Sequence, residues 1–127
     1  MGESVGLVGL GLVGSALTER LLNHGFKVVG YDIDPEKNDR LNTLGGSAVP
    51  GVAAVARESR RIILSLMTSQ IVHEVVEGPD GLLESGFPPS QIIDPTTGDP
   101  ELTVALSERL RARGISYLDA TVSGSSR

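Results

Sequence analysis

The chain of 127 residues contains no cysteine and no tryptophan. Without cysteine, disulfides and thiol chemistry are excluded, which fits a location in the cytoplasm. No apolar run approaches the roughly 20 residues of a membrane-spanning helix. The apolar N-terminus carries Glu3 and lacks the basic segment of a signal peptide. The formal net charge of −5 gives no electrostatic reason to bind nucleic acid or an anionic membrane, so neither partner is expected.

Metal-binding patterns are also missing, because no cluster of histidine and acidic residues has the spacing of a metal site. The remaining composition is ordinary for a globular protein, with 39% hydrophobic and 21% charged residues. This length can bury a core but is too short for two domains. We therefore expect one domain over residues 1–127, without a metal.

Short apolar runs alternate with helix-type repeats along the whole chain. The predicted strands are Val5–Val8, Lys27–Tyr31, Ser47–Val49, Arg61–Leu66, Gln91–Asp94 and Ile115–Asp119. The predicted helices are Val13–His24, Pro35–Leu44, Gly51–Glu58, Ser69–Glu77 and Pro100–Arg113. Each connection is long enough for a right-handed crossover. The pattern predicts an α/β fold with a doubly wound parallel sheet of six strands, order 3-2-1-4-5-6, and a ligand at its carboxyl edge.

Capping residues mark where several of these helices begin and end. Asp34 and Asp99 each precede a proline and are predicted N-caps, and Ser69 is the predicted cap of the fourth helix. Gly25 and Gly114 follow the first and last helices and are predicted to end them.

A glycine motif connects the first strand to the first helix. Gly9, Gly11 and Gly14 form the pattern Gly-x-Gly-x-x-Gly. In a dinucleotide site the three glycines permit a tight turn, a close approach to pyrophosphate, and close packing of helix on sheet. The free N–H groups around Leu12 and Val13 would then face the diphosphate, with the helix dipole behind them. The alternative is a glycine-rich turn with a purely structural role.

An acidic residue follows the second strand at the spacing that such a site requires. Asp32 comes 18 residues after Gly14, close to the roughly 20 expected for the carboxylate that binds the adenosine ribose. The next residues contain a second acid, Asp34, and no arginine for a 2′-phosphate. NAD is therefore favoured over NADP. The alternative makes Asp32 and Asp34 ordinary turn and cap residues.

Four segments give the chain a more specific resemblance. It resembles the N-terminal domain of the β-hydroxyacid dehydrogenases, the family of 3-hydroxyisobutyrate dehydrogenase and 6-phosphogluconate dehydrogenase. The segments are Gly6–Gly14, Leu66–Ser69, Asp94–Pro100 and Tyr117–Ser125, of which the last is the most specific. The resemblance implies a Rossmann sheet, a nicotinamide cofactor, and hydride transfer to or from a small hydroxy acid.

The same resemblance implies roles for single residues. Gly9, Gly11, Leu12 and Val13 would hold pyrophosphate and Asp32 the ribose, while Leu66, Met67 and Thr96 would line the path to the nicotinamide. Ser123 and Gly124 would bind the substrate carboxylate. Thr121 and Ser125 depart from the family's usual proline and glycine, which leaves the hydroxy acid open. The structural alternatives are a core position for Met67, loop-shaping roles for Thr96 and Thr97, and a turn role for Ser123.

The base for this chemistry is not found among these residues. In the family it is a lysine on a long helix after the substrate loop, and the two lysines here, Lys27 and Lys37, do not occupy that place. His24 lies at the wrong edge, and His73 has no evident carboxylate partner. We expect this chain to bind the cofactor but not to catalyse the reaction alone. A helical second domain is expected to complete the cleft and to form a homo-oligomer.

Two other classes stay open at this point. One is a stand-alone NAD-binding regulator or pseudo-enzyme. The other is an S-adenosylmethionine methyltransferase, although its first strand typically ends in an acid where Val8 stands here.

Overall fold

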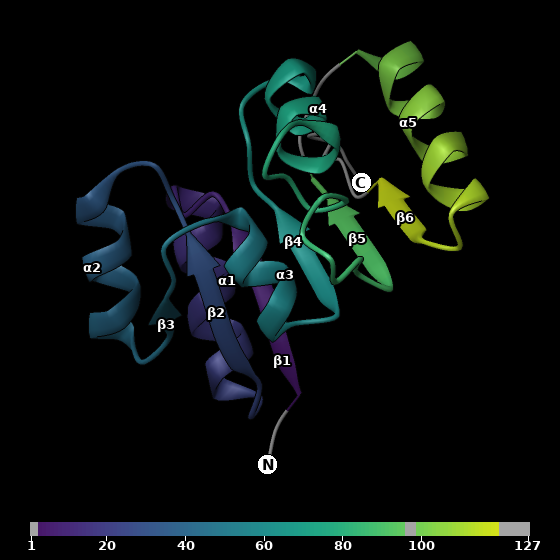
Figure 1. Cartoon of the computed structure of the whole chain (residues 1–127). Coiled ribbons are helices and arrows are strands. Elements are labelled where there is room, and N and C mark those ends of the chain that lie inside the picture. The colour runs from purple at the N-terminus through teal and green to yellow at the C-terminus, as the bar shows by residue number, and fades with distance from the viewer. Residues whose placement is uncertain (1–2, 96–98, 120–127) are drawn as a thin grey trace, which may run out of the picture.

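The computed structural model describes residues 3–95 and 99–119. Strand and helix alternate through both ranges (Figure 1). The strands are β1 (Ser4–Val8), β2 (Lys27–Tyr31), β3 (Ser47–Ala48), β4 (Arg61–Leu64), β5 (Gln91–Asp94) and β6 (Ser116–Asp119). The helices are α1 (Leu12–Asn23), α2 (Pro35–Leu44), α3 (Val52–Glu58), α4 (Ser69–Glu77) and α5 (Pro100–Ala112).

The strands form one sheet in the order β3-β2-β1-β4-β5-β6, and every pair of neighbours is parallel. The predicted doubly wound α/β fold is confirmed, including its strand order. Because all strands run the same way, their carboxyl ends meet at the upper edge in Figure 1. The order reverses between β1 and β4, the place where such sheets open a ligand crevice.

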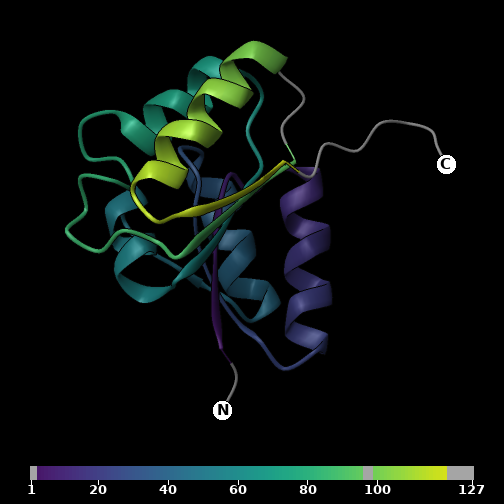
Figure 2. The same ribbon diagram turned by 90° about the vertical axis from the view of Figure 1, so that its right-hand side faces the viewer.

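Helices cover both faces of the sheet (Figure 2). On one face, α3, α4 and α5 bury a cluster that includes Val55, Val76 and Leu110. On the other, α1 and α2 cover a second cluster that includes Leu7 and Leu41. Parallel strands buried on both faces are expected to be almost continuously apolar, and β4 follows this rule with three buried residues after Arg61. These two cores hold the strands in place, and the loops at the carboxyl edge begin where the strands end.

Several element boundaries differ from the prediction by one or two residues, and β4 differs most. It ends at Leu64 instead of Leu66, because its neighbour β1 ends at Val8, which pairs with Leu64. Ser65 still donates its N–H to the Val8 carbonyl at 2.8 Å, and the ladder stops there.

The helix α4 has the predicted bounds, but its N-cap differs from the prediction. Thr68, not Ser69, is the N-cap, and its side chain accepts a hydrogen bond from the N–H of Ile71. Ser69 is already helical, and its hydroxyl accepts from the N–H of Asp99 at 2.8 Å. The prediction that Ser69 caps this helix was wrong by one residue.

The other predicted caps are confirmed. Asp34 and Asp99 each accept from the N–H two residues ahead, with proline in the first turn. Gly25 and Gly114 follow their helices at φ values of 89° and 79°, a conformation that glycine adopts without strain. Among the described residues, no helix is long and apolar enough to cross a bilayer.

Candidate functional site

The glycine turn lies at the carboxyl edge, between the ends of β2 and β4. Gly9 donates its N–H to the carbonyl of Tyr31 at 2.9 Å and has φ +96°. A Cβ built on Gly9 would lie 2.1 Å from the Ser65 carbonyl oxygen. A side chain is therefore excluded at Gly9 for two reasons: it would clash with the Ser65 carbonyl, and the positive φ is strained for any residue other than glycine.

The other two glycines of the motif have different surroundings. A Cβ on Gly14 would lie 2.6 Å from the Gly9 carbonyl oxygen, so Gly14 lets α1 pack against the turn. A Cβ on Gly11 would meet no atom within 4 Å, so Gly11 borders open space. Gly11 is the N-cap of α1, and no side chain caps the helix. The first N–H groups of α1, at Leu12 and Val13, have no acceptor within the helix. An open, uncapped helix N-terminus behind a close-approach glycine fits a diphosphate.

Asp32 follows the last residue of β2 and faces this turn. Its Oδ2 accepts a hydrogen bond from the N–H of Leu10 at 2.7 Å, and its Oδ1 accepts from the N–H of Asp34 at 2.8 Å. The side chain is half-buried, and no ion pair to it is found within residues 3–95 and 99–119. An ionised carboxylate has about four acceptor positions, so two remain for a diol. The carboxylate is therefore oriented by backbone and still able to accept.

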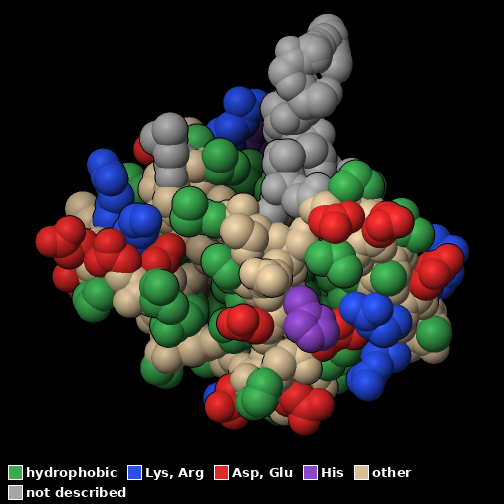
Figure 3. Space-filling view, turned by 90° about the horizontal axis from the view of Figure 1, so that it is seen from above, with side chains coloured by type: hydrophobic (Ala, Val, Ile, Leu, Met, Phe, Trp, Pro, Cys, Tyr) green, Lys and Arg blue, Asp and Glu red, His purple; other side chains and the backbone are tan. Residues whose placement is uncertain are grey.

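Apolar side chains are exposed along the same edge, which Figure 3 shows from above. Ile33, after Asp32, is 88% exposed, Met67 is 85% exposed and Val13 is 52% exposed. Leu66 is half-buried. The alternative that Met67 belongs to the core was wrong, because its side chain is among the most exposed of the large apolar ones. These side chains follow β2 and β4 or lie at the start of α1, so they border the same edge as Gly11.

The other predicted contacts lie outside the described residues. These are Thr96 and Thr97, the substrate residues Ser123 and Gly124, and the departures Thr121 and Ser125. Their roles stay predictions, as do the cofactor roles of the residues that the structure places at this edge.

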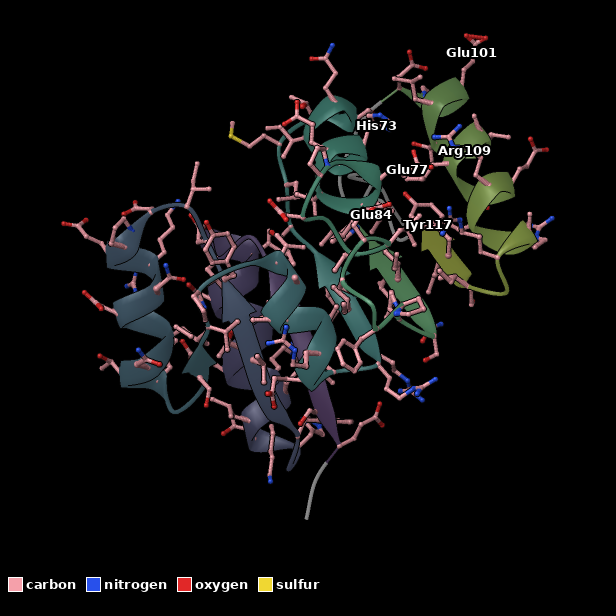
Figure 4. The ribbon with its side chains drawn as sticks, in the orientation of Figure 1. His73, Glu77, Glu84, Glu101, Arg109 and Tyr117 are labelled. Carbon is pink, nitrogen blue, oxygen red and sulfur yellow. The ribbon has the colours of Figure 1, made fainter. Side chains whose placement is uncertain are left out.

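A groove lies between α4 and α5, with a volume of about 500 Å³. His73, Arg109 and Tyr117 line it, and Figure 4 shows His73 and Arg109 turned toward Glu77 between the helices. None of the described cofactor residues lines this groove. Tyr117 donates its hydroxyl hydrogen to Asp94, which is buried.

His73 has a carboxylate partner, which the sequence analysis did not find. Its Nδ1 lies 2.8 Å from Oε1 of Glu77, one helical turn away, and Arg109 binds the same carboxylate. The Arg109 hydrogen bond lowers the pKa of Glu77 from its ordinary value, against the opposing effect of burial. Spacing of four residues on a helix was the available signal. This arrangement links α4 to α5 and lies apart from the glycine turn.

The two lysines have the places that the sequence predicts. Lys27 is the first residue of β2, at the amino edge of the sheet. Lys37 is in the first turns of α2, beside the end of β2. Two other contributors were missed: the N–H of Leu10, and Asn38, whose side chain binds the backbone of Asp32.

Comparison with known proteins agrees with this geometry. The sequence matches, over residues 4–127, the family described as the NAD binding domain of 6-phosphogluconate dehydrogenase. Mitochondrial 3-hydroxyisobutyrate dehydrogenase of Homo sapiens is 33% identical over 120 residues, which cover 94% of this chain and 36% of that protein. The 3-hydroxyisobutyrate dehydrogenase of Mycobacterium tuberculosis, solved with L-serine, superposes with a TM-score of 0.86 at 24% identity, covering 98% of this chain and 42% of that one.

Two further structures with the same fold come from imine reductases of Myxococcus stipitatus. Each has a TM-score of 0.82 at 22% identity, and they cover 94% and 91% of this chain and 40% and 39% of theirs. The V8 variant was solved with NAD+, and the other with NADP+. The chain thus spans less than half the length of these proteins. The family match, which extends over nearly the whole sequence, also removes the methyltransferase alternative: this protein belongs to the family of the 6-phosphogluconate dehydrogenase NAD-binding domain, together with the 3-hydroxyisobutyrate dehydrogenases.

Proposed function

We propose that this domain binds NAD in preference to NADP, and that Asp32 sets the preference. The observation that carries the proposal is the orientation of the Asp32 carboxylate by Leu10 and Asp34 at the end of β2. The pyrophosphate would lie on the N–H groups that open α1, next to Gly11. The two acceptor positions left on the carboxylate suit the 2′ and 3′ hydroxyls of the adenosine ribose.

The preference follows from charge. A 2′-phosphate would bring close to two negative charges beside an ionised carboxylate, which costs on the order of 1–3 kcal/mol at a protein surface. Residues 33–36, which follow Asp32 directly, include a second acid, Asp34, and no arginine to compensate. NAD carries no such phosphate, and its ribose hydroxyls donate to the same oxygens.

Calorimetric titration of the chain with NADH and with NADPH tests this proposal. We expect NADH to bind at least tenfold more tightly. Equal affinity, or tighter NADPH binding, would overturn the role of Asp32. If neither binds, the proposal of a cofactor site fails as a whole.

We further propose that the protein transfers hydride between NAD and a small β-hydroxy acid. The support is the family and the names of its relatives, including 3-hydroxyisobutyrate dehydrogenase and L-threonate dehydrogenase. When bound, NAD supplies the hydride acceptor; the chain's own residues hold and orient it. Removal of the hydroxyl proton needs a base within about 3 Å. Neither lysine is placed to be this base, because Lys27 begins β2 and Lys37 flanks the ribose end.

Assays of NAD reduction with 3-hydroxyisobutyrate, glycerate and threonate separate the possibilities. We expect no turnover above trace by these 127 residues, and turnover when the remaining length of the relatives is supplied as a fused C-terminal region. Turnover by the chain alone would show that the base is within it. NAD binding without turnover in either form would favour the regulatory alternative. A homo-oligomer and a cytoplasmic location belong to the same proposal and are checked by light scattering and by fractionation.

A further inference from the structure

The backbone of Asp32 is bound by a side chain from the next helix. Oδ1 of Asn38 accepts the N–H of Asp32 at 2.9 Å, and Nδ2 of Asn38 donates to the carbonyl oxygen of Asp32 at 2.8 Å. Both bonds are half-buried. Only one orientation of the amide satisfies both, because the flipped amide would place a donor against a donor. The pair therefore fixes Asp32 through two bonds of defined direction.

These bonds replace partners that the sheet no longer provides. Registered pairing between β1 and β2 ends at Val8 and Tyr31, and β3 pairs only with Val29 and Gly30. Asp32 is the first residue beyond both ladders. The Asn38 amide occupies the place of a peptide group on an adjacent strand and extends the order of β2 by one residue.

The consequence reaches the carboxylate, because its two other contacts depend on where this backbone lies. The Asp32 side chain spans between the N–H of Leu10 and the N–H of Asp34. If the backbone at Asp32 shifts, one of these bonds lengthens and the carboxylate turns. From this geometry we infer that Asn38 is a positioning residue for cofactor selection: it holds the acid that discriminates NAD from NADP, without contacting the cofactor itself. This inference rests on the proposed function of Asp32.

The helix provides a matched control, Asn42, one turn further along α2. Its Oδ1 accepts the N–H of Ala48 at 2.9 Å, so it too ties α2 to the backbone of the sheet, but at β3. Alanine substitution at either asparagine removes a side chain–backbone link from the same helix. Only Asn38→Ala releases Asp32.

The experiment measures the dissociation constants of NADH and NADPH for the wild type, Asn38→Ala and Asn42→Ala, together with urea unfolding of each. We expect Asn38→Ala to weaken NADH binding about threefold to tenfold, as for the loss of one or two net hydrogen bonds, and to leave NADPH binding within twofold. The ratio of the two constants therefore falls. Asn42→Ala lowers the unfolding midpoint but keeps the ratio.

The possible outcomes distinguish a failure of the role of Asn38 from a failure of the role of Asp32. If the wild type does not discriminate, the role of Asp32 fails. If the wild type discriminates and Asn38→Ala keeps the full ratio, the positioning role of Asn38 is overturned while that of Asp32 stands. An equal fall of the ratio in both alanine variants would likewise overturn it, as an effect of stability. Should Asn38→Ala not fold, Asn38→Ser replaces it, because a hydroxyl on this short side chain cannot bridge both groups.

Discussion

Arg109 of α5 forms a bidentate ion pair with Glu77 of α4. The Arg109 Nε and Nη2 donate to the two carboxylate oxygens of Glu77, each at 2.7 Å. The Glu77 side chain is only 16% exposed, whereas Arg109 is about half exposed. This pair therefore links the two helices, and Arg109 also lines the groove between them. Two-point geometry of this kind is the form of surface ion pair that contributes measurable stability.

The first prediction concerns Glu77 and pH. The Arg109 hydrogen bond lowers the pKa of Glu77 in the folded protein below its ordinary value of 4.5. A lowered pKa means that the folded state favours the ionised form, so its stabilising effect is present above about pH 4.5 and is lost as pH falls through the lowered pKa. We expect Glu77→Gln to reduce the free energy of unfolding by about 0.5–1 kcal/mol at pH 7.

Urea unfolding at pH 7 and at pH 3 checks this. The difference between wild type and Glu77→Gln should shrink at the lower pH. Glu74→Gln is the matched control, since Glu74 is exposed on the same helix and no ion pair to it is found among the described residues. A difference that persists undiminished at pH 3 would contradict an electrostatic origin.

The second prediction separates two glycines of one motif. Gly9→Ala puts a Cβ against the Ser65 carbonyl at a φ of +96°, so it should cost more than about 2 kcal/mol in stability. Gly11→Ala meets open space and should cost at most about 1 kcal/mol. The same methyl group, however, would occupy the side of the turn where pyrophosphate approaches, and we expect NADH affinity to fall more than tenfold.

Gly51 supplies the control for Gly11. It is also an uncapped helix N-cap, its Cβ would also meet no atom within 4 Å, and it precedes α3 on the opposite face of the sheet from α1. Gly51→Ala should match Gly11→Ala in stability and bind NADH normally. If both substitutions leave binding unchanged, the pyrophosphate does not lie at Gly11.

The third prediction concerns the charge of Asp32. Asp32→Asn removes the negative charge, and its NH2 group cannot accept from one of the two N–H groups that the carboxylate binds. We expect the NADPH affinity to rise relative to that of NADH by about tenfold, in line with the loss of one nearby charge. Stability should fall by about 1–2 kcal/mol because one N–H loses its acceptor.

Asp34→Asn is the matched control, because it removes the same charge two residues away and asparagine caps helices as well as aspartate does. The relative affinities of the two cofactors, measured by calorimetry, should shift much less in this variant. Equal shifts in both would mean that general charge, and not the position of Asp32, controls the preference.

The strand order and the helix caps were predictable from the sequence, because the first follows from a pattern that runs along the whole chain and each cap depends on a few adjacent residues. The strand order followed from the alternation of apolar runs and helices, and the caps Asp34 and Asp99 from the proline that follows each. The end of β4 was not predictable in this way: it is set by where β1 ends, a partner more than fifty residues away. The apolar pattern of residues 61–66 contains no information about where β1 ends.

In the candidate site, too, some residues had local sequence signals and one did not. The glycine spacing and Asp32 are local signals, and the structure brings them to one edge through the Leu10–Asp32 bond. Asn38 gave no signal, because an asparagine in the second turn of a helix is ordinary until the fold turns it toward the end of β2. The role of Asn38 depends on the orientation of its side chain toward Asp32, which the helical periodicity of the sequence does not specify.

The last prediction tests the N-cap of α4, which the sequence analysis placed one residue too late. Thr68 caps α4 by accepting from the N–H of Ile71 at 3.1 Å, whereas the Ser69 hydroxyl accepts from the N–H of Asp99. Thr68→Ala should therefore cost about 1 kcal/mol, and Thr68→Ser should restore most of it. Ser69→Ala should cost about 0.5 kcal/mol, because the N–H that it releases is exposed and can bind water. Urea unfolding of the three variants gives the ranking; a larger loss for Ser69→Ala than for Thr68→Ala would restore Ser69 as the cap.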